Sequence, residues 1–256
     1  MKIFSGSMII IIALLLLSGC TGNRAKQKNT SPGNDSITVP DTGFTGIKQY
    51  MSGSHLVREV TLKNGVKDGL VKTYYANGKL RQTFWYENGL REDSSLWYYE
   101  EGLVFQTTPY KRDTVDGIRK QYFRNGKLKA GIGYQKGLRN LYFEEFTQDG
   151  KLVSGYPGLT VNFKDIYNSR GIYRVLLELS DKSDKVRYYR GDLGGGVFDT
   201  TRCIKIKTTE GVGILDLKKS GSPQSGSVDI VAEILTNYGN NYLVHKKIEL
   251  PYKDLN

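Results

Sequence analysis

The residues of this chain that could support catalysis are few and lie far apart in the sequence. The chain contains two histidines and two cysteines, and neither His55 nor His245 has a ligand partner at metal-binding spacing. The motifs H-E-x-x-H, G-x-S-x-G and C-x-x-C do not occur. Adjacent acids such as Glu144 and Glu145 would point to opposite faces of a strand and could not act as a pair. The sequence therefore predicts a protein with no enzymatic activity, no metal and no cofactor.

The two cysteines predict different roles. Cys20 follows a basic start at Lys2 and an apolar run of about ten residues (8–17), the length of a signal-peptide core and short for a membrane span. The run ends in L-S-G-C, which resembles a bacterial lipobox. The resemblance implies cleavage after residue 19 and attachment of lipid such as palmitate to Cys20; the alternative is an uncleaved membrane anchor. Cys203 is then the only thiol left, which excludes an intramolecular disulfide and predicts an inert core side chain.

Composition bounds the remaining classes. The formal net charge is +11, and no block of like charge stands out, so nucleic acid is not a predicted partner. Lysines alternate with apolar residues, which is typical of a solvated basic surface on a sheet. The alternative explanation of the positive charge is weak attraction to anionic lipid heads or phosphorylated glycans. Residues 20–45 are polar and rich in Gly, Pro and Ser, so we expect a flexible tether after a signal peptide at 1–19.

A repeat with a period of 24 residues occupies residues 46–158. Apolar and aromatic residues alternate with polar ones inside each unit, which predicts strands. Asn-Gly and Asp-Gly turn signals separate the strands. Two strands per unit predict an antiparallel β ribbon of about ten strands. The units are 63–86, 87–110, 111–134 and 135–158, and a degenerate copy precedes them.

The positions that recur most strictly predict the core of the repeats. If Tyr74 and Leu80 recur together because they share a face, they are cross-strand neighbours, which requires a three-residue connection. We expect their equivalents to form one continuous apolar stripe along the ribbon. The predicted repeat core is Tyr74, Leu80, Tyr98, Val104, Tyr122, Leu128, Phe146 and Leu152.

The stretches "YYANGKL", "YFRNGKL" and "FTQDGKL" resemble the bacterial variant of the MORN repeat, with its aromatic-x-x-[ND]-G-K-L core. Some proteins with these repeats are labelled antitoxin-like. The resemblance implies an antiparallel β ribbon that interacts with proteins or lipid surfaces. Two units depart from the pattern. One has Glu101-Gly102-Leu103-Val104 at its turn, and the next has Asp113 where the glycine between units is expected.

Residues 159–256 lack the period. About seven short alternating segments separated by Gly/Ser/Asn-rich turns predict an antiparallel β-sandwich of immunoglobulin-like build. The whole chain is therefore predicted to be all-β, with a tethered ribbon followed by a sandwich.

A second aromatic row beside the predicted core is the candidate contact face. One periodic row is explained by the core of the ribbon, whereas a second row among lysines and arginines could stack on sugars or partner side chains. The candidate contact residues are Tyr75, Trp85, Trp97, Tyr99 and Phe123.

These features predict a membrane-anchored envelope lipoprotein that binds another envelope protein without catalysis. The alternative is a protein that binds glycans or anionic lipids of the envelope. A third class, an enzyme of unrecognised type, would require a polar cluster near residues 155–159, which the sequence does not show. Thr21 follows Cys20 where an inner-membrane retention signal would have Asp, and no acidic cluster follows. The resemblance therefore points to the outer membrane, facing the periplasm.

Overall fold

The computed structural model describes residues 43–256. The predicted signal peptide, Cys20 and nearly all of the predicted tether lie outside the described residues. The regular secondary structure of the described part is almost all antiparallel β-strand, with one short helix, α1 (Tyr167–Arg170), and one 3₁₀ turn, η1 (Gly194–Gly196). The predicted all-β class is confirmed.

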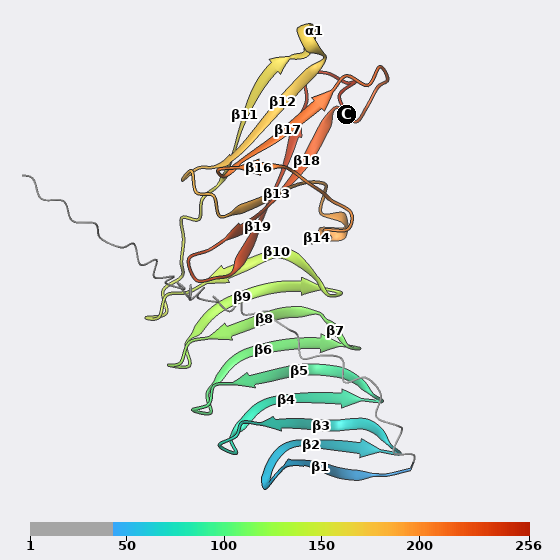
Figure 1. Cartoon of the computed structure of the whole chain (residues 1–256), viewed down its shortest axis with the longest axis vertical. Helices are drawn as coiled ribbons and strands as arrows, with labels where there is room; N and C mark the ends of the chain where they lie inside the picture. The colour runs from blue at the N-terminus through green and yellow to red at the C-terminus, as the bar shows by residue number, and fades with distance from the viewer. Residues whose placement is uncertain (1–42) are drawn as a thin grey trace, which may run out of the picture. The chain divides into compact units, whose positions relative to one another are not determined.

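The repeat array supplies ten strands of an 11-stranded antiparallel sheet (Figure 1), in the order β1-β2-β3-β4-β5-β6-β8-β9-β10-β14, with β7 paired to β6. Consecutive strands are neighbours, as the predicted ribbon requires. The last strand in the order, β14 (Val197–Phe198), comes from the C-terminal half and pairs with β10, which the sequence did not predict. The array strands are β1 (Gly46–Ser52), β2 (His55–Lys63), β3 (Val66–Tyr74), β4 (Leu80–Glu87), β5 (Leu90–Tyr98), β6 (Val104–Lys111), β7 (Thr114–Val115), β8 (Gly117–Tyr122), β9 (Leu128–Gln135) and β10 (Leu138–Glu145).

Two kinds of turn alternate along the array. The turns between units contain two residues, both with positive φ, as at Asn64 (φ 50) and Gly65 (φ 79). Such turns match the right-handed twist of the flanking strands. The turns inside units are longer, and Tyr75 N–H donates to Lys79 O at 2.8 Å across three intervening residues. This is the predicted three-residue connection.

The predicted register inside the units is confirmed. Tyr74 pairs with Leu80, and the equivalent pairs Tyr98–Val104 and Tyr122–Leu128 form 24 and 48 residues later. Next to each pair one strand carries an extra residue; in the first unit this is Arg81, because the adjacent pair is Thr73–Gln82. A bulge of this kind increases local twist and bends the strand, and the array strands are visibly curved in Figure 1.

The deepest core of the array lies away from the predicted stripe. Val60, Val71 and Ile132 are 1–5% exposed, and Val71 pairs with both Val60 and Phe84 on one face of the sheet. The predicted repeat-core residues lie beside the turns and are half-buried, except Leu152, which is 60% exposed. The predicted stripe therefore forms at the turn-side margin of the ribbon, whereas Val60, Val71 and Ile132 form the buried centre of the ribbon.

Residues 159–256 form two four-stranded sheets, ordered β11-β12-β17-β16 and β15-β13-β18-β19. Both sheets contribute to one core, with Val175, Leu177 and Leu217 from the first and Tyr188 and Ile230 from the second fully buried. The eight strands of these two sheets can be numbered one to eight in chain order. The first sheet then contains the first, second, sixth and fifth strands, and the second sheet the fourth, third, seventh and eighth. This is the immunoglobulin arrangement A-B-E-D and C′-C-F-G. The predicted sandwich is confirmed. Its strands are β11 (Leu159–Ile166), β12 (Ile172–Leu179), β13 (Val186–Arg190), β15 (Ile204–Lys205), β16 (Thr208–Thr209), β17 (Val212–Lys218), β18 (Ser227–Leu235) and β19 (Asn241–Glu249).

Candidate interaction surface on the repeat array

One row of apolar side chains crosses the array on the face opposite Val60 and Val71. Directly paired residues of antiparallel strands share a face, and the pairs on this face include Ile47–Thr61, Leu70–Trp85 and Ile118–Gly133. The row occupies equivalent positions in successive units. We call its larger members the outer row: Ile47, Leu70, Trp85, Pro109, Ile118 and Tyr142.

Four of the six members of the outer row are exposed although they are apolar, whereas Leu70 and Pro109 are half-buried. Ile47 is 63% exposed, Trp85 43%, Tyr142 41% and Ile118 38%. Single exposed apolar residues are ordinary on a protein surface, whereas a contiguous apolar patch marks a site of interaction. At roughly 4.8 Å per strand, a row from β1 to β10 is on the order of 40 Å long.

Two glycines allow the row to continue to its last strand. A Cβ atom on Gly133 would lie 2.7 Å from Tyr142 Cβ and 2.0 Å from Asn140 Oδ1, and one on Gly131 would lie 3.3 Å from the Tyr142 ring. The missing side chains let Tyr142 lie across the neighbouring strand. Tyr142 also bonds to Glu144, and this bond, with a smaller effect of burial, raises the pKa of Tyr142.

The predicted contact residues do not gather on one face. Tyr75 and Tyr99 are half-buried, and their hydroxyls donate to the carbonyl oxygens of Tyr98 and Tyr122 in the next unit. Phe123 occupies the same repeat position without a hydroxyl. The Tyr75 and Tyr99 side chains therefore link successive units. Trp85 alone among the five predicted residues belongs to the outer row.

Trp97 belongs to a run of rings on the inner face. Its ring centroid lies 6.5 Å from Phe84 and 6.1 Å from Phe105, and Phe105 lies 5.2 Å from Tyr99. Edge-on and tilted pairs at these distances add stability beyond the area that they bury. A contact role for Trp97 stays a prediction, whereas its packing inside the array is direct.

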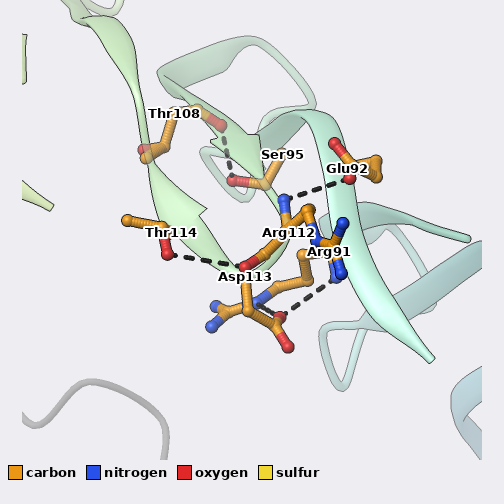
Figure 2. Close-up of polar contacts among 7 residues, drawn as sticks. All are labelled: Arg91, Glu92, Ser95, Thr108, Arg112, Asp113 and Thr114. Atoms are coloured by element: carbon orange, nitrogen blue, oxygen red, sulfur yellow. Dashed lines mark hydrogen bonds and ion pairs between the residues drawn. The ribbon is translucent and has the colours of Figure 1, made fainter. Parts of the chain in front are cut away.

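The turn that departs from the repeat pattern is held by an ion pair (Figure 2). Asp113 takes a left-handed conformation (φ 65), where the equivalent turns have glycine. Its Oδ1 accepts bonds from the backbone N–H of Arg91 at 3.0 Å and from Arg91 Nε at 2.8 Å. Beside it, Arg112 N–H donates to Glu92 Oε1 at 3.1 Å. The carboxylate thus offsets the strain that glycine avoids elsewhere.

This ion pair also changes the titration of Asp113. Partial burial alone would raise the pKa of the carboxyl, but the two bonds from Arg91 and its charge together hold the pKa below its usual range.

Asp113 N–H donates to Arg91 O at 2.9 Å, as Gly89 donates to Lys67 O at 2.7 Å. Each such turn is therefore tied to the unit before it.

A buried acid joins the array to the sandwich. Glu145, at the end of β10, is 0% exposed. Its Oε1 accepts from Thr236 Oγ1 at 2.9 Å and from Asn240 Nδ2 at 2.8 Å, and its Oε2 accepts from Tyr156 Oη at 2.9 Å. Sequence reasoning missed this cluster because two of the three partners, Thr236 and Asn240, lie 91 and 95 residues downstream. It lies at the junction where the enzyme alternative required polar groups, but its donors are neutral and already engaged.

A cavity of about 260 Å³ adjoins this cluster, with Lys185, Tyr238 and Tyr242 among its lining residues. The donors around Glu145 satisfy the carboxylate, so the cluster is built to hold two parts of the chain together. Burial raises the pKa of Tyr242 to about 12, so its hydroxyl stays neutral at physiological pH.

The remaining reactive residues lie apart from one another. His245 Nε2 lies 2.8 Å from Asp229 Oδ1 on the neighbouring strand, and His55 is exposed at the start of β2. Cys203 is half-buried, and burial, assisted by Asp192 and Asp199, raises the pKa of its thiol. Over residues 43–256, no three His, Cys, Asp or Glu side chains are grouped to hold a metal ion.

Comparison with known proteins identifies the repeats. Residues 67–88 and 115–135 match the MORN repeat variant. The two matches begin two periods apart and cover the hairpins β3–β4 and β8–β9. Both departures from the pattern, the Glu101–Val104 turn and Asp113, lie in the stretch between the two matches, residues 89–114. No curated protein and no solved structure is significantly similar to the chain.

From residue 43 onward, no helix has the length and apolar character needed to cross a membrane. Any anchor at Cys20 would lie in the part of the chain before the described residues.

Proposed function

We propose that this protein is a lipoprotein of the bacterial cell envelope, anchored through Cys20, whose repeat array binds another envelope protein. MORN repeats commonly serve as modules for interaction with proteins or membranes. The outer row carries the proposal. Its exposed rings and aliphatic side chains are of the kinds that supply anchor residues in protein interfaces. The proposal includes no catalytic step, and it places the protein at the outer membrane, facing the periplasm.

The shape of the row favours an extended partner. Trp85, Ile118 and Tyr142 are spread over β4 to β10, and Trp85 and Ile118 are each flanked along their own strand by more buried residues. A partner that binds there would contact one side chain from each of several strands. Binding energy would then depend on a few aromatic and aliphatic anchors.

A binder of glycans or anionic lipids is the second candidate. Lys79, Lys127 and Lys151 occupy the same position in their turns, at one margin of the ribbon. Two of them already have partners, since Lys127 Nζ donates to Asp149 O at 2.9 Å and Lys151 Nζ lies 3.0 Å from Asp149 Oδ2. This margin is therefore less available to an anionic surface than the outer row is to a protein.

The test is site-specific cross-linking of the tagged full chain in intact cells. A photo-reactive amino acid at Ile118 should yield one cross-linked protein in stoichiometric amount. That product should disappear in Trp85→Ala/Tyr142→Ala and persist in Phe163→Ala, an equally exposed aromatic (48%) on the sandwich. Recovery of lipid or glycan only, with binding that falls steeply as salt rises, would replace the protein-binding proposal by the second candidate.

A further inference from the structure

The two ends of the array sheet differ. At the β10 end, β14 reaches across from the sandwich and pairs Phe198 with Arg139 and Val197 with Asn140. At the other end, β1 is the last strand in the sheet order, and no described strand pairs with its outer edge. Such an edge presents a row of unpaired backbone N–H and C=O groups to any strand that can pair with it.

Strand β1 lacks the features that usually protect an edge. Its seven residues, GIKQYMS, include no proline and a single charged side chain, Lys48. Ile47 is 63% exposed and Met51 56% exposed, and they lie on the same face of the strand as the exposed Gln49. Within residues 43–256 the edge is therefore unpaired, and two of the three exposed side chains on one face, Ile47 and Met51, are apolar.

The spacing of these residues is self-complementary. In an antiparallel pair of identical strands related by a two-fold axis at Gln49, Ile47 of each copy lies opposite Met51 of the other. On the other face, Lys48 lies opposite the Tyr50 ring of the second copy. Tyr50 already accepts cations on its ring, with Arg58 at 4.7 Å and Lys48 at 5.8 Å from its centroid.

The other registers are worse for physical reasons. Moving the axis by one residue to Lys48 places two lysines opposite each other, which is destabilising. Moving it to Tyr50 leaves Ile47 without a partner residue in the strand. An axis between two residues would pair the outer face of one copy with the inner face of the other, because side chains alternate along a strand.

We propose that β1 is a homodimerisation edge, at which a second copy of this chain pairs antiparallel around Gln49. Seven facing residues would add about six to eight backbone hydrogen bonds. The outer rows of the two copies would meet at their Ile47 ends and form one continuous surface. This inference does not depend on what the outer row binds, because a dimer can form with or without that partner; its tests use the chain anchored through Cys20 as proposed above, and the Cys203→Ser chain without a further cysteine gives the background yield due to Cys20.

The first test is disulfide cross-linking of the full chain in membranes, in a Cys203→Ser background. Gln49→Cys places two thiols directly across the axis, within the Cα separation that a disulfide spans. Ser52→Cys is the matched control on the same exposed strand, where the axis would separate the two copies by about 20 Å. We expect a disulfide-linked dimer for Gln49→Cys only. Equal yields, or no dimer in either, would overturn the proposal.

A charge-exchange pair tests the register without relying on cysteine. Ile47→Lys/Met51→Lys places like charges opposite each other twice and should give monomers by mass photometry of the detergent-solubilised full chain. Ile47→Lys/Met51→Glu places Lys opposite Glu in both pairs and should restore the dimer. These two side chains lie about 14 Å apart within one strand, so the rescue requires a second copy. Dimers in both variants, or in neither, would refute pairing around Gln49.

Discussion

Removing one hydroxyl in Tyr99→Phe tests whether the units of the array are held together by side-chain bonds to the next unit. Tyr99 Oη donates to Tyr122 O at 2.9 Å. The ring itself packs on Phe105 at 5.2 Å and lies under Arg124 at 4.7 Å. Phenylalanine keeps both ring contacts, so the substitution isolates the hydrogen bond.

The expected cost is about 1 kcal/mol, with up to about 1 kcal/mol more because the half-buried carbonyl of Tyr122 loses its partner. With a urea m value of roughly 2–3 kcal/mol/M, the midpoint should fall by about 0.3–1 M. Fluorescence is a suitable signal, because the two tryptophans of the chain, Trp85 and Trp97, both lie in the array.

The repeat provides its own reverse experiment. Phe123 occupies the position of Tyr75 and Tyr99, and the acceptor at the equivalent distance along the chain is Phe146 O. Phe123→Tyr should therefore raise the midpoint, by up to about 1 kcal/mol of added stability. An unchanged midpoint for Tyr99→Phe together with a lowered one for Phe123→Tyr would refute the reasoning.

Four further predictions follow from individual contacts. Asp113→Ala should cost about 1–2 kcal/mol in urea unfolding, because alanine keeps the left-handed strain and loses Arg91, whereas Asp113→Gly should cost less. Gly133→Ala should lower the melting temperature by several degrees through its clash with Asn140 and Tyr142. Burial and the hydrogen bond to Glu59 raise the pKa of Tyr74 to about 12, so the stability that this shift contributes is complete below pH 10 and is lost as pH rises toward 12. Tyr74→Phe should remove this pH dependence of the free energy of unfolding. Glu145→Gln should lower the free energy of unfolding by about 1–3 kcal/mol, as measured by calorimetry. The reason is that the carboxylate accepts hydrogen bonds from Thr236 and Asn240, whereas the NH₂ group of glutamine is itself a donor and could not accept them.

Short-range chemistry explains why so much of the array could be predicted. Positive φ at Asn64-Gly65 and its equivalents is a property of the turn residues themselves. The Tyr74–Leu80 pairing follows from the length of one connection. The strand order then requires only that each strand pair with the next one along the chain. The sandwich followed from the same alternation, since six of its seven predicted segments each contain one strand, and the remaining segment, 201–209, divides into β15 and β16 of different sheets.

The surface of the array could not be predicted in the same way, because bulges interrupt the alternation. Because Arg81 is an extra residue in its strand, strict alternation counted from the turn assigns each later side chain of β4 to the wrong face of the sheet. A second irregularity lies inside each hairpin between units, near Gly69 (φ 108), Asp93 (φ 56) and Gly117 (φ 116). Tyr75 and Trp85, which counting from the sequence placed in one contact row, therefore have different surroundings.

The sequence by itself determined the period, the turns, the pairing of neighbouring strands and the sandwich, because each depends on residues only a few positions apart. The tertiary structure decided which apolar row is exposed, how β14 closes one end of the sheet, and where Glu145 is buried. Those outcomes depend on accumulated bulges and on contacts such as Glu145–Asn240, which join residues 95 positions apart. No local pattern of side chains encodes a contact of that range.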